Sequence, residues 1–551
     1  MTTLDARKRS ASLKAVSGGK LDLVIVGGGI NGAGIAHDAA LRGLKVLVLE
    51  QKDLGFGTSS RSSKLIHGGL RYLEHYQFKL VFEGTNERAV LRHMAPHLVS
   101  PLLFALPVYE GDRHPLWKID VGLWMYDGLS LFKTEQRHIT FRSPKRMLER
   151  EPLLNPEGLT GGIVYYDCIT DDARLVLENA LAAAQLGATV LTRAKVVGVD
   201  APPQGDVRVS FEDVTTGRRL SVFAKGVVNA TGAWTDSVRR LAHVESSVIR
   251  ATKGVHVVLK KQDLAVRQAV AMMAPQDGRV IFAIPWNERT VLGTTDTDDA
   301  SDPASPIVTR ADVEYLLEAA NVRFPSADLS PADVISAWVG LRPLIRPDES
   351  LESASDVPRE HRIYRDGRVV SVAGGKLTTY RKMAEEVVDV AVETIGARCA
   401  DPSTKQARLP GAVGLDESPA DFASMLATEA SLPPDVAARL AHVYGARARG
   451  VLSRAVNDRG LLERVTKERD VIWAEVVFAV EEEMAMSVED VLVRRTSLAL
   501  TADDCGVSAA ERVADLIGDR LGHDARARKQ GLDEFEASLA LTMGWKRSHP
   551  A

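Results

Sequence analysis

The hydrophobic residues near the start of the chain alternate between short unbroken runs and a helical spacing. Residues 21–26 form an apolar run that ends in glycine, a pattern typical of a buried parallel strand. Residues 30–42 have helical spacing and stop before Gly43, a residue that suits the position after a helix. A second apolar run, 45–49, ends at Glu50. Strand, helix and strand in this order predict a βαβ unit with a right-handed crossover.

The pattern changes several times along the rest of the chain. We expect long polar loops with scattered aromatic residues over residues 55–160. Residues 245–345 contain short apolar runs separated by Gly, Pro and Asn, a pattern that predicts mainly β-strands. Helix and strand patterns return in residues 172–232 and 368–396. Beyond residue 411, Ala, Leu, Glu and Arg recur at helical spacing, which predicts a separate α-helical domain.

Composition narrows the class of protein. The 551 residues are enough for about three or four domain-sized units, and 45% of them are hydrophobic, which excludes disorder as the main state. A net charge of only −4 argues against a dedicated nucleic-acid binder. The cysteines, Cys168, Cys399 and Cys505, are too few and too far apart for a disulfide framework, and they favour a reducing compartment.

A glycine cluster between the first strand and the helix carries the strongest local motif. Residues 27–32 read Gly-Gly-Gly-Ile-Asn-Gly and contain G-x-G-x-x-G. In this pattern Gly27 permits the tight turn, Gly29 lets the backbone approach a pyrophosphate, and Gly32 allows close helix–strand packing. Glu50 at the end of the second strand can accept the ribose hydroxyls and would repel a 2′-phosphate, which disfavours NADP. The motif predicts a dinucleotide site without separating FAD from NAD.

Three further motifs point to a flavin. Residues 227–234 form an apolar strand that ends in Ala-Thr-Gly, so that backbone can lie beside a cofactor. Residues 57–72 are rich in Ser, Thr and Gly, can hold flavin phosphate and ring edges, and deliver His67 and Arg71. Residues 371–380 repeat strand, glycine pair and helix, which aims a helix N-terminus at a negative group such as the pyrimidine edge of a reduced flavin.

The order of these motifs and their amino-acid sequences resemble those of the FAD-dependent glycerol-3-phosphate dehydrogenases, within the wider D-amino-acid-oxidase-like flavoproteins. The runs SSKLIHGGLRYLE and GGKLTTYRKMAE are far more specific than the glycine fingerprint, and residues 487–496 look like that family's late motif. The resemblance covers residues 20–400 and, more loosely, the C-terminal domain. It implies FAD as cofactor and oxidation of sn-glycerol 3-phosphate to dihydroxyacetone phosphate, with electrons passed to a membrane quinone.

The resemblance and the hydrophobic pattern together predict the fold class. We expect an α/β fold in which a Rossmann-like FAD-binding domain is interleaved with a mainly β substrate domain and followed by a C-terminal α-helical domain. The predicted boundaries are a basic N-terminal arm at 1–20, a FAD-binding domain at 21–80, 160–245 and 345–400, a substrate domain at 81–159 and 246–344, and a helical domain at 401–551.

The resemblance also implies the residues of the active site. The substrate phosphate needs cations, which would be Arg71 and Arg342, with Lys376 as a third near the flavin. The base for the hydroxyl proton stays open among His67, His256 and Lys376. Tyr72 and Thr295 complete the predicted substrate site. The predicted cofactor residues are Gly27, Gly29, Asn31, Gly32, Glu50, Thr58, Ser59, Ser63, Lys64, Ala230, Gly232, Gly375, Lys376, Leu377 and Thr378.

Other chemistries lack support in the sequence. His93 and His97 have i,i+4 spacing, but Pro96 would disrupt the helix that this spacing requires, so no metal site is predicted. The alternative with the same substrate is an oxidase that passes electrons to oxygen. The oxidases of the family that the motifs resemble often carry an extra insertion between the core motifs, and the absence of an obvious one in this sequence favours the dehydrogenase. A non-catalytic flavin-binding regulator would need the phosphate cations to be absent. An NAD-linked dehydrogenase predicts a colourless protein.

The predicted acceptor sets the expected location. No run approaches 18 uninterrupted apolar residues and residues 1–20 have no apolar signal region, so we expect a cytoplasmic protein held peripherally on the inner face of the cell membrane. Its partners would be a membrane quinone and an anionic lipid surface, without nucleic acid, and a homodimer is compatible with the sequence. The N-terminal arm is expected to be a solvated tail or, with the C-terminal domain, a candidate for lipid contact.

Overall fold

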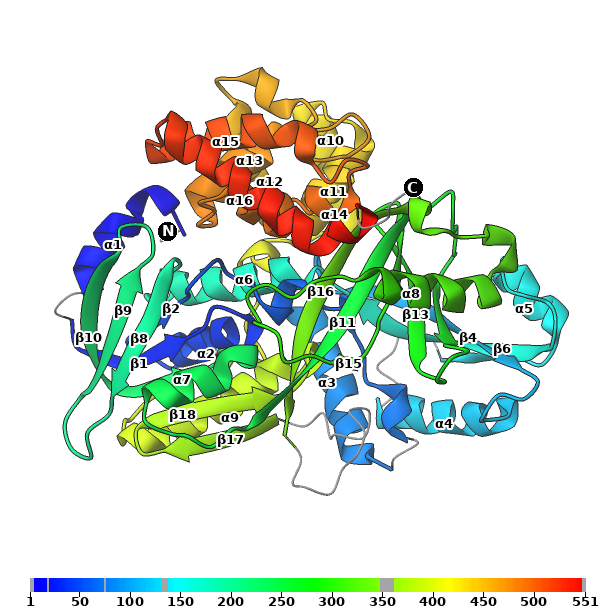
Figure 1. The fold of residues 1–551 in the computed structure, drawn as a ribbon, viewed down its shortest axis with the longest axis horizontal. Coiled ribbons are helices and arrows are strands. Elements are labelled where there is room, and N and C mark those ends of the chain that lie inside the picture. The colour runs from blue at the N-terminus through cyan, green and yellow to red at the C-terminus, as the bar shows by residue number, and fades with distance from the viewer. Residues whose placement is uncertain (1–3, 17–18, 74–75, 131–136, 347–360, 548–551) are drawn as a thin grey trace.

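Two β-sheets and a C-terminal group of helices organise the chain in the computed structural model, which describes residues 4–16, 19–73, 76–130, 137–346 and 361–547. The C-terminal helices, yellow to red, stack across one side of the molecule, where they contact strand β16 (Val334–Ile345) of the second sheet (Figure 1). The chain passes between the two sheets more than once, so segments far apart in sequence complete each of them.

The first sheet has a parallel centre. Strand β1 pairs in parallel with β10 on one side and β2 on the other, with Val26 opposite Asn229 and Leu49. Helix α2 (Ile30–Leu41) lies beside it and packs against both α6 (Asp172–Gln185) and α9 (Tyr380–Ile395). The strands, in chain order, are β1 (Leu21–Val26), β2 (Val46–Leu49), β7 (Thr189–Leu191), β8 (Ala194–Asp200), β9 (Val207–Asp213), β10 (Arg218–Asn229), β17 (His361–Asp366) and β18 (Val369–Gly374). The predicted βαβ unit, β1–α2–β2, is confirmed.

The second sheet is mixed and is assembled from two separate stretches of chain. Its long pairs, β11 with β16 and β4 with β6, are antiparallel. A short parallel pairing of β4 with β12, with Phe104 opposite Ala269, joins the two stretches. The strands are β3 (Leu65–Ile66), β4 (Ser100–Tyr109), β5 (Ile139–Phe141), β6 (Leu159–Ile169), β11 (Ile249–Lys260), β12 (Ala269–Met273), β13 (Val280–Trp286), β14 (Arg289–Gly293), β15 (Thr297–Asp298) and β16 (Val334–Ile345).

Helices around these sheets correct the sequence prediction at two places. Instead of long polar loops, residues 55–160 include α3 (Phe78–Met94), α4 (Leu116–Leu129) and α5 (Pro144–Arg150) besides β4 and β6. The apolar residues of α4 lie partly outside the core, so their spacing does not mark a core-facing helix. Within the predicted β stretch lies α8 (Arg310–Arg323), which begins at a capping box between Thr309 and Asp312. Helix α7 (Thr235–Leu241) precedes this β stretch.

Two strands cross the predicted domain boundaries. Strand β6 and the short β3 that pairs with it belong to the second sheet, although residues 65–66 and 160–169 fall in the range predicted for the cofactor domain. Extended pairing of β6 with β4 continues to Ile169, opposite Ser100, and this long pairing explains the difference. The exact division of the chain into domains stays a prediction, whereas the α/β class with a β-rich second part and a helical C-terminal domain is confirmed.

The N-terminal arm is docked on the protein, so the prediction of a solvated tail is wrong for residues 4–16. Its helix α1 (Arg9–Val16) begins with a buried arginine. The guanidinium of Arg9 donates to the Thr192 carbonyl at 2.8 Å and to the Asp213 carboxylate at 2.8 Å. Because a charge this deeply buried needs partners, these bonds fix the arm against the first sheet.

The C-terminal domain shares its hydrophobic core with the first sheet. One buried cluster runs without interruption from α2 and α6 into α11 and α13. The helices are α10 (Pro419–Ala430), α11 (Pro434–Tyr444), α12 (Ala448–Leu452), α13 (Trp473–Glu482), α14 (Leu498–Thr501), α15 (Val507–Leu521) and α16 (Ala525–Met543), with a π-helical turn at Asp490–Arg495. Across the described ranges, no helix combines the length and apolar character needed to cross a membrane.

Candidate active site

A cavity of about 640 Å³ opens where the parallel strands of the first sheet end. Residues at or just beyond the carboxyl ends of β1, β2, β10 and β18 line it. Ligands of open α/β sheets bind at this edge, and the volume lies within the range of small-molecule sites, about 300–1,000 Å³. The cavity is therefore the natural place for the dinucleotide that the glycine motif predicts.

The glycine turn at this edge is closely packed. Gly27 has φ +105°, and a Cβ there would lie 2.7 Å from the Ala230 carbonyl oxygen. A Cβ at Gly32 would lie 1.9 Å from the Gly27 carbonyl oxygen. A side chain at Gly27 would therefore push the turn away from Ala230, and one at Gly32 would push α2 away from the turn. The start of α2 is therefore held directly beneath the cavity, with its N-terminal dipole directed at any bound phosphate.

Glu50 lies at the end of β2, where its carboxylate borders the cavity. One oxygen accepts from the Gly28 amide at 2.6 Å and the other from the Lys52 amide at 2.7 Å. Burial raises the pKa of Glu50 while these two amides oppose that change. Because a carboxylate has about four acceptor positions, Glu50 retains capacity for the hydroxyls of a ribose.

Most of the predicted cofactor residues line this cavity. They are Gly27, Gly29, Asn31, Glu50, Thr58, Ser59, Ala230, Gly232, Gly375, Lys376 and Leu377. Sequence reasoning did not select Phe56, Lys195, Trp234 and Pro343, which also line it. Trp234 stands in a motif that the sequence did single out, whereas Lys195 comes from β8 and has no local pattern that marks it.

The other predicted cofactor residues, Gly32, Ser63, Lys64 and Thr378, are not among the described residues that border the cavity. Thr378 exchanges hydrogen bonds with the backbone of His67, at 3.1 and 3.2 Å. Gly32 packs against the glycine turn, as described above. The assignment of these residues to the cofactor stays a prediction.

Lys64 is held in a buried ion pair. Its Nζ lies 2.6 Å from Asp172 and sits over the indoles of Trp286 and Trp338, at 5.1 and 5.5 Å from their centroids. Burial lowers the pKa of Lys64, but Asp172 and Asp171 more than offset it, so the pKa is raised overall. Lys64 therefore stays charged and contributes a fixed positive potential to the residues around it.

His256 on β11 is the most constrained of the predicted bases. Its Nε2 lies 2.8 Å from the Ser63 hydroxyl, and its ring stacks on Trp338. Burial lowers the pKa of His256 well below its usual value, and the nearby charges of Arg342 and Lys64 lower it further. The imidazole is therefore neutral at physiological pH, and its unprotonated ring nitrogen is a weaker base than that of an exposed histidine.

Arg342 on β16 lies close to this histidine, next to Pro343 of the cavity wall. Its guanidinium donates to the Asp296 carboxylate at 3.1 Å, to the Thr294 hydroxyl at 2.9 Å and to the Thr295 carbonyl at 3.1 Å. The Thr295 hydroxyl accepts from the Val255 amide at 2.9 Å. The polar edge of the second sheet thus presents a fixed arginine fork.

The loop after β3 and the loop after β18 meet on the same side. The hydrogen bonds between His67 and Thr378 tie them together, and the Lys376 ammonium lies 3.6 Å from the centroid of the Tyr72 ring. The predicted substrate residues Tyr72 and Lys376 are therefore neighbours. The side chain of Arg71 lies outside the described part of the structure, so its predicted role stays a prediction.

A buried network supports the first of these loops and was not predicted. The Gly68 amide donates to the Tyr126 hydroxyl at 2.9 Å, and that hydroxyl donates to Asp167 at 2.7 Å. Arg88 of α3 pairs with the same carboxylate. The residues come from α4, β6 and α3, so no local spacing in the sequence links them.

Among the described residues, no group of three His, Cys, Asp or Glu side chains could hold a metal ion.

The amino-acid sequence matches two known family models and several curated proteins. Residues 22–381 match the family model described as FAD dependent oxidoreductase, and residues 402–528 match the C-terminal domain of alpha-glycerophosphate oxidase. The aerobic glycerol-3-phosphate dehydrogenase of Staphylococcus haemolyticus (strain JCSC1435) is 36% identical over 510 residues, which are 90% of this chain and 89% of that protein. The protein of the same name from Staphylococcus aureus (strain USA300) is 35% identical over 548 residues, 97% of each.

Solved structures agree with these matches. The X-ray structure of the glycerol-3-phosphate dehydrogenase from Bacillus halodurans complexed with FAD has a TM-score of 0.81 and 33% identity, and it covers 98% of both chains. The dithionite-reduced L-alpha-glycerophosphate oxidase from Mycoplasma pneumoniae with FAD bound has a TM-score of 0.54 at 20% identity. It covers 71% of this chain and 99% of that chain, and at this identity it shows the fold alone.

Proposed function

The chain belongs to the FAD-dependent oxidoreductases, among the aerobic glycerol-3-phosphate dehydrogenases, and from this we propose that it oxidises sn-glycerol 3-phosphate to dihydroxyacetone phosphate. One observation carries the proposal: the predicted base His256 and the predicted phosphate ligand Arg342 lie on the paired strands β11 and β16, and Arg342 adjoins Pro343 of the cavity wall. A phosphorylated secondary alcohol needs this combination of a cation, a proton acceptor and an adjacent cofactor.

The residues of the cavity fit FAD. We assign the pyrophosphate to the glycine turn and the start of α2, and the adenosine ribose to Glu50. Thr58 and Ser59 add hydroxyls, and the second glycine pair, ending at Gly375, lets the backbone lie close to the ring system. When bound, FAD supplies the hydride acceptor, which the protein side chains cannot provide.

The protein residues bind the substrate and handle its proton. Arg342 would form forked hydrogen bonds to the phosphate, with Lys376 and Arg71 as further cations. We assign His256 as the base, because a neutral imidazole can accept the hydroxyl proton and the Ser63 contact and the Trp338 stack fix its orientation. His67 and Lys376 remain the alternatives that mutation would have to exclude.

We further propose a membrane quinone as electron acceptor, with the protein attached to the inner, cytoplasmic face of the membrane. An exposed apolar surface on α4 supports this. Trp117, Val121, Trp124 and Met125 recur at helical spacing, so they share one face, and Trp117 is 69% exposed and Trp124 50% exposed. Tryptophans on a surface helix are typical of contact with the lipid headgroup region.

Residues around this helix extend the surface. Tyr76, which is 80% exposed, and Phe82 of α3 add aromatic area, because α3 packs against α4. The exposed side chains of Lys79, Lys118 and Arg137 add positive charge that an anionic lipid surface would attract. We define the α3–α4 surface by these residues together with Trp117, Val121, Trp124 and Met125. It lies away from the C-terminal helices (Figure 1).

The α3–α4 surface replaces the segments that the sequence favoured for lipid contact. The N-terminal arm is docked through Arg9 and is less suited to that role. Helix α3 also packs against the turn Leu377–Thr379, and Tyr126 of α4 supports Gly68. The helices proposed to meet the membrane therefore contact the loops proposed to surround the flavin, which supports an acceptor that arrives from the membrane.

The spectrum of the purified holoenzyme before and after anaerobic glycerol 3-phosphate tests the proposed reaction. Flavin bands that bleach on addition would support both cofactor and substrate. Bands that persist would contradict the substrate, and a folded protein without flavin would contradict the cofactor assignment as well. Reoxidation by a short-chain quinone, compared with reoxidation by oxygen, then separates a dehydrogenase from the alternative oxidase. The mass of the protein in solution tests the predicted homodimer.

A further inference from the structure

The loop that follows β2 forms one wall of the cofactor cavity. Glu50, Gln51, Phe56 and Gly57 line the cavity, whereas Asp53 in the middle of the loop points away from it and is fully buried. The loop is tied to the glycine turn, because the Gly55 amide donates to the Gly28 carbonyl at 2.9 Å. A shift of this loop would therefore move the cavity wall and the glycine turn together.

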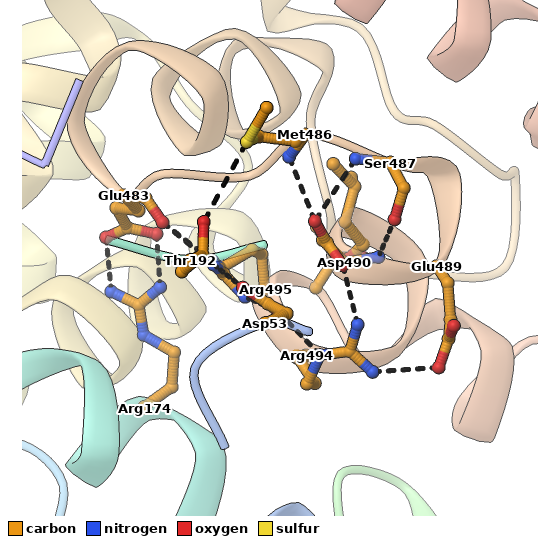
Figure 2. Close-up of polar contacts among 12 residues, drawn as sticks. Asp53, Arg174, Thr192, Glu483, Met486, Ser487, Glu489, Asp490, Arg494 and Arg495 are labelled. Carbon is orange, nitrogen blue, oxygen red and sulfur yellow. Dashed lines mark hydrogen bonds and ion pairs between the residues drawn. The ribbon is translucent and has the colours of Figure 1, made fainter. Parts of the chain in front are cut away.

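The C-terminal domain holds Asp53 with two arginines. Arg494 Nε donates to one carboxylate oxygen at 2.6 Å, and Arg495 donates to both oxygens at 2.8 Å each (Figure 2). Both arginines stand on the π-helical turn Asp490–Arg495, far from the loop in sequence. Forked bonds between buried charges are strong and directional, and removing one partner of such a pair is strongly destabilising.

Other contacts fix the arginines, so they can act as rigid supports. Arg494 also donates to Asp490 at 2.7 Å and to Glu489 at 2.9 Å, and Arg495 donates to the Glu483 carbonyl at 2.8 Å. The Arg494 guanidinium carbon further lies 5.6 Å from the centroid of the Phe56 ring, which lines the cavity. The Arg494 side chain therefore approaches a residue of the cavity wall from the C-terminal domain.

A second ion pair joins the same two parts of the protein without touching the loop. Arg174 of α6 forms a bidentate pair with Glu483, at 2.6 and 2.7 Å, and both side chains are fully buried (Figure 2). Burial together with these bonds holds the domains against each other, but neither residue lines the cavity. Because the Glu483 backbone carbonyl also accepts from Arg495, a change confined to the Glu483 side chain provides the control for the role of Asp53.

We propose that Arg494 and Arg495 are positioning residues for the cofactor, and that the C-terminal domain controls FAD retention through their bonds to Asp53. The inference rests on the proposed function only in taking the cavity as the FAD site. It assigns to the helical domain a role in the cofactor site in addition to its share in the hydrophobic core.

The test is FAD release from purified holoenzyme, followed without substrate as the rise in flavin fluorescence on serial dilution. Asp53→Asn is expected to raise the dissociation constant and the release rate of FAD at least about tenfold, because the loop loses its charged anchor. Both Asp53→Asn and Glu483→Gln are expected to lower the unfolding temperature by similar amounts, because each breaks a buried ion pair. In Glu483→Gln, however, the FAD dissociation constant should stay within about twofold of the parent. Arg495→Lys, which keeps the charge but loses the fork, should fall between the parent and Asp53→Asn.

Two results would overturn the proposal. One is an FAD dissociation constant unchanged in Asp53→Asn, and the other is an equal rise in Asp53→Asn and Glu483→Gln, which would mean that the interface acts on stability alone. If Asp53→Asn does not fold, Arg495→Lys carries the same comparison. Because no substrate is present, the outcome is independent of whether glycerol 3-phosphate is the substrate.

Discussion

The imidazole of His256 stacks on the indole of Trp338, with ring centroids 4.9 Å apart and planes inclined by 14°. The two residues stand opposite each other on the paired strands β11 and β16, so the register of the second sheet sets their contact. The stack also buries the imidazole, and burial lowers its pKa. One pairing between strands thus fixes both the orientation and the protonation state of the proposed base.

Replacing the proposed base should remove proton transfer and leave the cofactor in place. We expect His256→Asn to lower kcat by about 10²–10⁴-fold, the range that general-base catalysis usually contributes. The flavin content should be unchanged, because His256 does not line the cavity. Anaerobic single-turnover reduction of the flavin measures this directly. Trp338→Phe is the control, and it should retain most of the parent kcat because it keeps an aromatic partner for the imidazole. A kcat for His256→Asn within about threefold of the parent would move the role of base to His67 or Lys376.

The pH profile should report the lowered pKa of His256. A histidine whose pKa lies below the usual 6.5 is neutral at every pH above that lowered value, so it stays able to accept a proton in mildly acidic solution. We therefore expect no loss of kcat/KM from His256 as the pH falls from 7.5 through 6.5, once the protonation of the substrate phosphate, whose second pKa is about 6, is taken into account. A half-maximal loss near pH 6.5 that disappears in His67→Gln would instead identify His67 as the titrating base.

Arg342 should act mainly on substrate binding. Arg342→Ala is expected to raise KM for glycerol 3-phosphate by about 10–100-fold, the equivalent of one or two charge-assisted hydrogen bonds, with FAD still bound. Arg342→Lys should recover only part of the affinity, because an ammonium cannot form the fork. Asp296→Asn is the control, since Thr294 and the Thr295 carbonyl still hold the guanidinium. Loss of FAD with no separate effect on KM would contradict the role.

The cofactor edge of the site could be predicted from sequence because its contacts are local. Gly27, Gly29 and Glu50 lie within one βαβ unit, where a strand end and a helix start fix their positions. The supports of the site could not be predicted, because they depend on tertiary contacts. Arg495 meets Asp53 across more than four hundred residues, and nothing in either local sequence reports the pair. Exposed Trp117 likewise breaks the rule that apolar helical spacing marks a core-facing side.

Removing the tryptophans of the α3–α4 surface should weaken binding to membranes. We expect Trp117→Ser combined with Trp124→Ser to reduce the partition of the protein onto vesicles of anionic lipid by about tenfold or more, because two large interfacial side chains are lost. Sedimentation with the vesicles measures the bound fraction. Val456→Ser is the control, since Val456 is another highly exposed apolar residue but lies in the C-terminal domain. Equal losses in both variants would contradict a specific membrane surface.

Two buried histidines should make the protein sensitive to acid. Burial lowers the pKa of His37 to about 4, and burial together with His442, Arg174 and Arg447 lowers the pKa of His97 to about 3. Both values lie below the unfolded value of 6.5, so the unfolded chain takes up these protons first. The stability that the neutral histidines provide is complete above pH 6.5 and is lost as the pH falls from 6.5 toward each folded pKa.

The loss should reach about 2–3 kcal/mol for each histidine at pH 4.5, which a lower unfolding temperature at that pH would register. His97 distinguishes this cause from general acid unfolding, because neither of its ring nitrogens has a hydrogen-bond partner among the described residues. An apolar side chain can therefore replace it without leaving a partner unsatisfied, and His97→Leu should lose less stability than the parent between pH 7.5 and 4.5. If the two proteins lose the same amount, protonation of His97 does not drive the acid transition.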